Sequence, residues 1–385
     1  MSGIRLLYVA LDQTVPGTLG GSVHVQSVAE GLAALGHDVH VATTPGGAWP
    51  AGRGVTWHAM SPPLGKPALR WLRAGAVTNL ARQIGARAIM ERYYNFGGEG
   101  VIAAGRIDVP AILEVNAPVI DHEGSRKRAL DRALLFEPMR RWRDRICRGA
   151  ALFVTPRAEI LPSWIDRERI LELEWGADTE RFRPDVAGPP PFARDPARIL
   201  CVFAGAFRPW HGAVQLAEAL ARRHEAGDTR FGGVFIGDGP ERSTVERAAS
   251  GVPGIVFTGP LAHDIMPRAI AACDVGVAPF DPAKHPPLAL SFYWSPLKIF
   301  EYMASGLPVV APAQPRLATL VHDGHEGVLY APHDPRGLDA ALLALADAGT
   351  RQRLGTAARD RAVRDFSWRA HCAALDARLR TLVRT

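Results

Sequence analysis

Short apolar runs and amphipathic stretches alternate along the first 50 residues. Residues 4–10 (IRLLYVA) form an apolar run typical of a buried strand, and residues 38–43 (DVHVAT) alternate as a second strand. Between them lie a turn-forming loop at 16–21 and a stretch at 25–35 whose apolar residues recur at helical spacing. This strand–loop–helix–strand order predicts the opening of a doubly wound parallel sheet.

Similar units continue through the first half of the chain. Further strand patterns lie at 86–91, 111–115, 150–155 and 170–173. Ligands of open parallel sheets bind beyond the carboxyl ends of the strands, so Glu91, Arg92 and Asn116 are candidates for a ligand cleft. For Glu91 and Arg92, local hydrogen bonding within a polar loop is the alternative interpretation.

A proline-rich segment at 178–197 separates this series from a second one. The second series has apolar runs at 199–205, 233–237, 255–258 and 275–278. One core rarely serves 385 residues, so the pattern predicts two successive α/β domains with a cleft between them. We place the N-terminal domain at 1–180 and the C-terminal domain at 198–365. Residues 366–385 form a terminal helix that could pack back on the first domain.

The segment 295–311 (SPLKIFEYMASGLPVVA) is the most informative stretch of the second half. Ser295 is expected to cap a helix that ends at Gly306, and a short strand follows at 309–311. A helix start attracts phosphate, so Lys298 could reach a diphosphate and Glu301 could accept hydrogen bonds from two sugar hydroxyls. The alternative is a capped helix carrying a surface Lys–Glu pair.

Three loops should lie at the same edge of the second sheet as this helix start. They read GAFRPWHG at 205–212, GDGP at 237–240 and TGPL at 258–261, and each follows an apolar strand. Arg208, His211 and Lys298 could therefore converge on one phosphate. Such convergence of several strand-end loops is harder to explain by packing than any single loop.

Composition places the chain among ordinary globular proteins, with 47% hydrophobic and 22% charged residues. Its four cysteines are scattered, without metal-binding spacing, and indicate reduced thiols in a cytoplasmic protein. We find no signal peptide pattern and no apolar run long enough to span a bilayer. The net charge of +6 suits an anionic partner.

Residues 126–148 carry a charge excess, with nine Lys or Arg residues against three acidic ones. This segment could dock an anionic acceptor or touch the inner face of a membrane peripherally. The alternative is the solvated face of a helix that covers the sheet. The segment has no nucleic-acid-binding motif, so nucleic acid is not an expected partner.

Six segments carry a family resemblance, and they span nearly the whole chain. In order they read LGGSVHVQSVAEGLAALGHDVHVAT, LEVNAP, WGADTERFRP, GDGPER, VFTGPLAHDIMPRAIAACDVGVAP and FEYMASGLPVVAP. They resemble the family 4 retaining glycosyltransferases of GT-B fold. The resemblance implies two Rossmann-like parallel-sheet domains facing each other across a cleft. It also implies that a nucleotide-diphosphate sugar binds mainly to the second domain and an acceptor mainly to the first, with no metal and no other cofactor.

The resemblance assigns roles residue by residue. Glu301 would hold the ribose hydroxyls, Lys298 would face the diphosphate, and residues 258–262 would contact the nucleobase. The implied donor-binding residues are Gly20, Gly21, Arg208, His211, Gly237, Asp238, Thr258, Leu261, Ala262, Tyr293, Pro296, Leu297, Lys298 and Glu301. The implied catalytic residues are Lys298, Glu301, Arg208 and Asn116.

Four positions depart from the family pattern. Ala206 and His211 stand where the family often has Arg and Lys, and Tyr293 stands where it has the first of two glutamates. Asn116 replaces a frequent histidine. We interpret Arg208 and Lys298 as substitutes for the missing cations.

The predicted function is hexosyl transfer, with retention, from a nucleotide sugar to an acceptor hydroxyl. A UDP-sugar is the default donor, and the acceptor could be a lipid, a saccharide or a small metabolite. The departures leave two alternatives open: a catalytically silent sugar-nucleotide binding protein and, less favoured, a UDP-sugar epimerase. The richness in Arg, Ala, Gly and Pro suggests a bacterial source.

Overall fold

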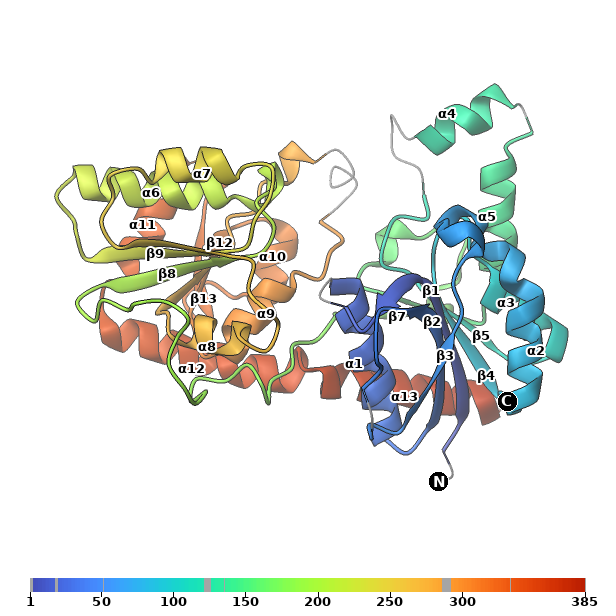
Figure 1. Ribbon diagram of the computed structural model, residues 1–385. Coiled ribbons are helices and arrows are strands. Elements are labelled where there is room, and N and C mark those ends of the chain that lie inside the picture. Colours follow the sequence, from blue (N-terminus) through green and yellow to red (C-terminus); the bar gives the residue numbers. More distant parts are fainter. Residues whose placement is uncertain are drawn as a thin grey trace. The chain divides into compact units, whose positions relative to one another are not determined.

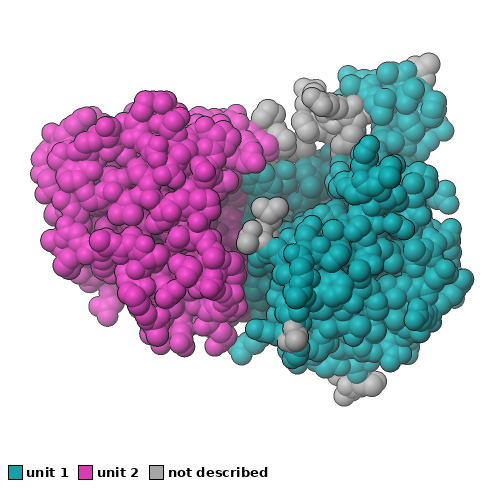
Figure 2. Space-filling view, viewed as in Figure 1, with its two compact units in different colours: residues 1–175, 293–295, 368–385 teal, residues 176–292, 296–367 magenta. Residues whose placement is uncertain are grey.

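The structure is a computed structural model that describes residues 3–17, 20–50, 52–120, 126–134, 136–285, 292–332 and 334–384. The chain divides into two units, which are coloured separately in Figure 2. The N-terminal unit consists of Met1–Trp175, Tyr293–Ser295 and Trp368–Thr385. The C-terminal unit consists of Gly176–Phe292 and Pro296–Ser367, and therefore includes the proline-rich segment.

A seven-stranded parallel sheet forms the centre of the N-terminal unit, in the order β3-β2-β1-β4-β5-β6-β7. Its strands are β1 (Arg5–Val15), β2 (Asp38–Pro45), β3 (Val55–Ala59), β4 (Ala88–Arg92), β5 (Ala111–Glu114), β6 (Leu152–Thr155) and β7 (Ile170–Glu172). Six of these strands are confirmed sequence predictions. The edge strand β3 lacks a buried residue, so it carries no apolar run that the sequence pattern could reveal.

Helices cover both faces of this sheet (Figure 1). They are α1 (Gly20–Ala34), α2 (Ala74–Ile84), α3 (Glu99–Ile107), α5 (Pro138–Gly149) and α13 (Trp368–Arg384), whereas α4 (Arg126–Ala133) packs against α5. The C-terminal helix α13 packs along α1, and the Sγ of Cys372 donates to the carbonyl oxygen of Val28 at 3.7 Å. A hydrogen bond of 2.6 Å joins His37 to Asp376 of the same helix.

The C-terminal unit contains a six-stranded parallel sheet in the order β10-β9-β8-β11-β12-β13. Its strands are β8 (Ile199–Ala204), β9 (Phe231–Ile236), β10 (Ile255–Gly259), β11 (Val275–Val277), β12 (Val309–Pro312) and β13 (Gly327–Tyr330). Its helices are α6 (Ala213–Glu225), α7 (Arg242–Ala248), α8 (Met266–Ala271), α9 (Leu297–Ala304), α10 (Pro315–Leu320), α11 (Gly337–Ala344) and α12 (Ala348–Asp365). In Figure 1, α6, α7 and α11 lie on one face of this sheet and α8, α9 and α12 on the other. Both units are therefore Rossmann-like, as the sequence predicts.

The helix α9 differs at its start from the sequence prediction. Ser295 does not cap it: the N-cap is Pro296, with no side-chain hydrogen bond. The Oγ of Ser295 instead donates to Glu174 at 2.7 Å and accepts from the backbone N–H of Trp175 at 3.0 Å. The predicted end of the helix is confirmed, because Gly306 takes a left-handed conformation with φ of 75°.

Two findings concern membrane-spanning helices and the cysteines. Across the described residues, no helix is long and apolar enough to cross a membrane. The four cysteines are free and buried.

Candidate functional site

Three glycines end the strands β8, β9 and β10 of the C-terminal unit. Gly205, Gly237 and Gly259 all have positive φ, at 129°, 125° and 70°. The N–H of Gly205 donates to Ile236 at 2.9 Å, and the N–H of Gly237 donates to Gly259 at 3.0 Å. A Cβ on Gly237 would lie 2.1 Å from the carbonyl oxygen of Gly205. The strand-end loops therefore lie backbone against backbone at the carboxyl edge of the sheet.

Replacing Gly237 with alanine is expected to destabilise the protein by more than about 2 kcal/mol, because it adds a backbone clash to an unfavourable φ. Gly251→Ala is the matched control, since its φ is 77° but nothing lies within 4 Å of the added Cβ. Urea denaturation measures the free energy of unfolding of both variants. Equal losses of stability would show that the contact between the loops is not tight.

Lys298, on α9, places its ammonium group at this edge. Its Nζ lies 3.4 Å from where a Cβ on Gly205 would be, 3.9 Å from the ring centroid of Phe203 and 5.1 Å from that of Phe280. The Nζ is buried and has no hydrogen-bond partner among the described residues. Burial lowers the pKa of Lys298 to about 7, against the opposing effect of Glu301. A buried amine with unused N–H donors is poised to bind an anion.

Glu301 lies one turn beyond Lys298 on the same helix. Burial raises the pKa of Glu301 to about 7, against the opposing charge of Lys298. No ion pair within 4.0 Å joins the two side chains, both of which the structure describes. The alternative of a surface Lys–Glu pair is therefore wrong for this helix. Glu301 offers carboxylate oxygens that a hydroxyl-bearing ligand could bind.

His211 and Arg208 lie on the loop that follows β8. The Nδ1 of His211 lies 2.7 Å from the carbonyl oxygen of Ala206, to which it donates. Burial lowers the pKa of His211 to about 3, and the charges of Lys298 and Arg208 add to this effect. The imidazole is thus neutral near pH 7. Arg208 is exposed, and its guanidinium lies 5.4 Å from the ring centroid of Trp210.

The remaining loop candidates lie at the β9 and β10 ends of the same sheet. Asp238 is exposed, and its carboxylate accepts from the N–H of Gly239 at 2.7 Å. Thr258 donates to the carbonyl oxygen of Gly259 at 2.8 Å, while Leu261 is half-buried and Ala262 is exposed. All of them lie at or just beyond the carboxyl ends of strands of the C-terminal sheet, so they share the edge that carries Lys298.

Tyr293 belongs to a different part of the structure from Lys298. It clusters with the N-terminal unit, whereas Pro296 and Leu297 begin α9 in the C-terminal unit. Tyr293 is buried, and its ring contacts that of Trp294 edge-on at 5.7 Å. Burial raises its pKa. The donor-binding role of Tyr293 stays a prediction.

In the N-terminal unit, Gly20 and Gly21 begin α1, as the sequence predicts. A Cβ on Gly21 would lie 2.2 Å from the amide oxygen of Gln13 and 3.4 Å from the Nη2 of Arg92. The missing side chain thus lets an arginine from the end of β4 approach a helix start. Arg92 also lies 3.7 Å from the carboxylate of Asp12.

Glu114, at the end of β5, is the centre of a buried polar cluster. Its carboxylate contacts the Nε2 of His24 of α1, whose pKa burial lowers, and accepts a hydrogen bond from the hydroxyl of Tyr8. The Nη1 of Arg92 lies 3.7 Å from it. Burial alone would raise the pKa of Glu114, but these partners hold it well below its usual range. Glu114 is therefore ionised at neutral pH.

Asn116 extends this cluster toward the loop after β5. Its Nδ2 donates to Glu114 at 2.7 Å, and its Oδ1 accepts from the indole N–H of Trp175 at 2.8 Å. The indole ring in turn contacts His24 at 4.3 Å and lies 5.7 Å from the guanidinium of Arg92. The structure thus brings Asn116, Arg92 and Gly21 into one region of the N-terminal unit.

Glu91 has a structural role. Its buried carboxylate accepts the N–H groups of Gly98, Gly100 and Val101 at 2.6, 2.8 and 3.0 Å. These groups belong to the start of α3, which would otherwise lack partners. The alternative of local hydrogen bonding is therefore the correct one for Glu91.

Sequence reasoning missed His24, Glu114 and Trp175. Glu114 carries one local signal, since it is a carboxylate that ends an apolar strand. His24 and Trp175 lie 90 and 61 positions from Glu114 in the sequence, so only the folded structure brings them into this cluster. Among the residues that the structure describes, no group of three or more His, Cys, Asp or Glu is arranged to hold a metal ion.

Two family models match the chain. Residues 198–348 match the model described as Glycosyl transferases group 1, and residues 20–161 match the Glycosyl transferase 4-like domain. The chain belongs to the group 1 glycosyl transferases. Both sheets of this glycosyl transferase, with their strand-end loops, fall largely within the two matches.

Two curated relatives of this glycosyl transferase match it over different lengths. Sulfoquinovosyl transferase SQD2 of Arabidopsis thaliana is 34% identical over 140 residues, which are 35% of this chain and 25% of that protein. D-inositol 3-phosphate glycosyltransferase of Acidothermus cellulolyticus is 28% identical over 325 residues, which are 77% of this chain and 67% of that protein. The chain thus spans only about a quarter of the length of the first relative.

Solved structures show the fold of this glycosyl transferase. HepE of Anabaena, in complex with UDP and glucose, has a TM-score of 0.69 to it at 16% identity. The match covers 98% of this chain and 100% of that chain. The fold is therefore the GT-B type of glycosyltransferases.

Proposed function

We propose that this protein transfers a hexose from a nucleotide-diphosphate sugar to an acceptor hydroxyl, with retention of configuration at the anomeric carbon. The observation that carries this proposal is Lys298. Its buried Nζ has no partner among the described residues and lies at the glycine-rich strand ends, where Rossmann-like sheets bind phosphates. HepE, which shares the fold, is a protein solved with UDP and glucose, and this supports a UDP-sugar as the donor.

In this proposal Lys298 and Arg208 stabilise the charge that develops on the departing diphosphate, together with the first N–H groups of α9. The bond between the anomeric carbon and the diphosphate oxygen breaks, and a bond to the acceptor oxygen forms on the same face. The hydroxyl proton passes to the diphosphate, so no protein base is required. Glu301 holds the ribose hydroxyls, and Asn116 retains one amide N–H for the acceptor.

We further propose that the protein acts in the cytoplasm and needs no metal or other cofactor. The nucleotide-sugar donor and an acceptor that is a lipid, a saccharide or a small metabolite are the expected partners. Ala206 favours one competing function, because it removes a cation that the family often has at the phosphate. A catalytically silent sugar-nucleotide binding protein would bind the donor without transfer or hydrolysis.

The test is a thermal-shift screen with UDP, GDP, ADP and TDP and with their sugar conjugates, followed by Glu301→Ala. Ligands that bind only the folded state raise the melting temperature by mass action. We expect a shift with the UDP series and a loss of donor affinity of roughly tenfold or more in the variant, since each charge-assisted bond contributes about 1.5–3 kcal/mol. Unchanged affinity in Glu301→Ala would contradict its role. Donor binding without transfer or hydrolysis would favour the catalytically silent binding protein. No shift of the melting temperature with any nucleotide would contradict the proposed function.

A further inference from the structure

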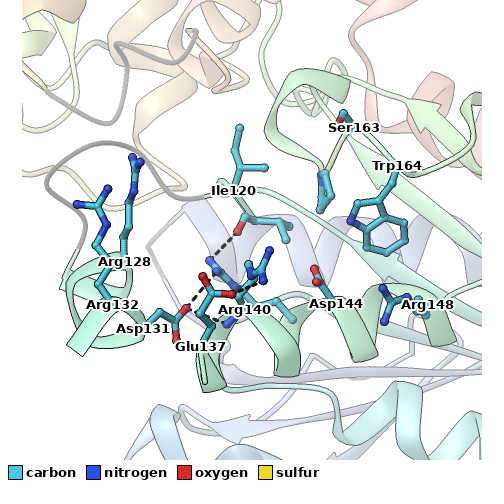
Figure 3. A pocket seen from close by; sticks show the side chains of 13 residues that line it. Ile120, Arg128, Asp131, Arg132, Glu137, Arg140, Asp144, Arg148, Ser163 and Trp164 are labelled. Atoms are coloured by element: carbon cyan, nitrogen blue, oxygen red, sulfur yellow. Dashed lines mark hydrogen bonds and ion pairs between the residues drawn. The ribbon is translucent and has the colours of Figure 1, made fainter. Parts of the chain in front are cut away.

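A pocket of about 750 Å³ lies in the N-terminal unit, apart from the Glu114 cluster (Figure 3). Its walls are α4, α5 and the two loops that continue from the carboxyl ends of β5 and β6. The lining residues are Val119, Ile120, Arg128, Asp131, Arg132, Glu137, Arg140, Arg143, Asp144, Arg148, Pro162, Ser163 and Trp164. Five of these are arginines, so much of the charge of the segment 126–148 faces one cavity.

One part of the lining is structural. The carboxylate of Asp131 accepts the N–H groups of Met139 and Arg140 at 2.8 and 2.9 Å, and so joins α4 to the start of α5. The buried guanidinium of Arg143 donates to the carbonyl oxygen of Val119 at 2.9 Å and lies 3.8 Å from Asp131. These contacts hold the walls of the pocket together. The charges of Asp131 and Arg143 are therefore already engaged within the protein.

The other arginines are available for a ligand. Arg140 is paired with Glu137, but Arg128, Arg132 and Arg148 have no acidic partner within the described parts of the chain. Figure 3 shows Arg128 and Arg132 extending from α4, and Arg148 on α5 beside Trp164. The guanidinium of Arg148 lies 5.4 Å from the indole centroid. Unpaired arginines of this kind match the geometry of phosphate oxygens.

Two further groups fit a ligand that also carries hydroxyls. Asp144 lines the same wall, one turn before Arg148, and has no ion pair in the described structure. Its carboxylate can accept hydrogen bonds from hydroxyl groups. The exposed ring of Trp164 offers an apolar face, against which the C–H groups of a sugar can pack.

We propose that this pocket binds the phosphate-bearing sugar or polyol group of the acceptor. The proposal rests on the proposed function, because it identifies the acceptor of that transfer as an anion. Such a group can belong to a soluble sugar phosphate or to a lipid headgroup. Leu130, Leu134 and Phe136, beside the pocket on α4 and the turn after it, are 45%, 39% and 56% exposed and could contact the apolar part of a lipid.

The test uses the full chain and matched variants. Arg132→Gln/Arg148→Gln removes two pocket charges, and Arg141→Gln/Arg145→Gln removes two exposed charges from α5 that do not line the pocket. Calorimetry compares glucose 6-phosphate with glucose. Flotation compares vesicles of phosphatidylglycerol with vesicles of phosphatidylcholine. UDP binding is measured on every variant.

We expect a phosphate-dependent signal in at least one assay, weakened about tenfold or more in the pocket variant and less than about twofold in the control. A signal with glucose 6-phosphate indicates a soluble acceptor, and a signal only with phosphatidylglycerol vesicles indicates a lipid. Equal weakening in both variants indicates non-specific attraction and overturns the proposal, as does the absence of binding in both assays. If the pocket binds its ligand but the protein does not bind UDP, the transferase function is contradicted. The pocket would then still be a binding site for a phosphate-bearing ligand.

Discussion

Replacing Lys298 with methionine is expected to weaken UDP binding strongly and, at the same time, to stabilise the folded protein. The Nζ is buried without a hydrogen-bond partner among the described residues, and burial lowers its pKa from 10.5 to about 7. The charged form therefore favours the unfolded chain at neutral pH. Methionine preserves the packing over Phe203 and removes this penalty, which is on the order of 2–4 kcal/mol.

The pH dependence separates this explanation from a simple packing effect. The folded pKa of Lys298 is depressed, so the unfolded chain binds more protons than the folded protein between about pH 7 and 10.5. The contribution of Lys298 to stability therefore becomes less unfavourable as pH rises through this window. The advantage of Lys298→Met, measured by urea denaturation, should shrink between pH 7 and pH 10.

The affinity for UDP tests whether Lys298 binds the diphosphate. A bound diphosphate favours the charged amine, so wild-type affinity should fall as pH rises above about 7, whereas residual binding by Lys298→Met should not show this dependence. Arg336→Met is a control, because this arginine is exposed and far along the chain from α9. A variant that binds UDP as the wild type does would contradict the phosphate role of Lys298.

Replacing Glu114 with glutamine is expected to cost about 3 kcal/mol of stability, because it removes the charge from the centre of a buried cluster. The carboxylate of Glu114 contacts the Nε2 of His24, accepts a hydrogen bond from Tyr8 and lies 3.7 Å from Arg92. Glutamine has nearly the same shape, so the loss reports the charge and its hydrogen bonds. Chemical denaturation at pH 7 gives the magnitude.

Acid titration provides the second readout for Glu114. Its folded pKa lies well below the usual value of 4.5 for a glutamate, so its contribution to stability is complete above that value and is lost as pH falls below it. The stability difference between wild type and Glu114→Gln should therefore be constant from pH 7 to about 5 and decrease below about 4.5. Glu159→Gln is the control, because Glu159 pairs with Arg157 on the surface and should cost less than about 1 kcal/mol. A Glu114 variant as mild as this control would show that the cluster does not stabilise the fold.

The sequence alone determined the order of elements and the family. Strands buried on both faces need continuous apolar runs, and helices need a 3.6-residue period, so β1, β2 and most other strands were visible as patterns. Gly205, Gly237 and Gly306 were visible as well, because positive φ and close backbone contacts restrict the residue type. These signals depend only on residues that are close in sequence, so they can be recognised without the structure. The edge strand β3 was not recognised because it has no buried residue and therefore no apolar run.

Only the tertiary structure decided which polar groups have partners. Ser295 looked like a helix cap, but its hydroxyl bonds to Glu174 and Trp175, more than 100 positions earlier in the chain. Glu91 looked like a ligand-binding residue and instead satisfies the first N–H groups of α3. The sequence left a surface Lys–Glu pair open as the alternative for Lys298, but long-range packing buries its Nζ, and five arginines of 126–148 line a cavity. Burial and pairing depend on residues that are distant in sequence, so no local pattern could have supplied them.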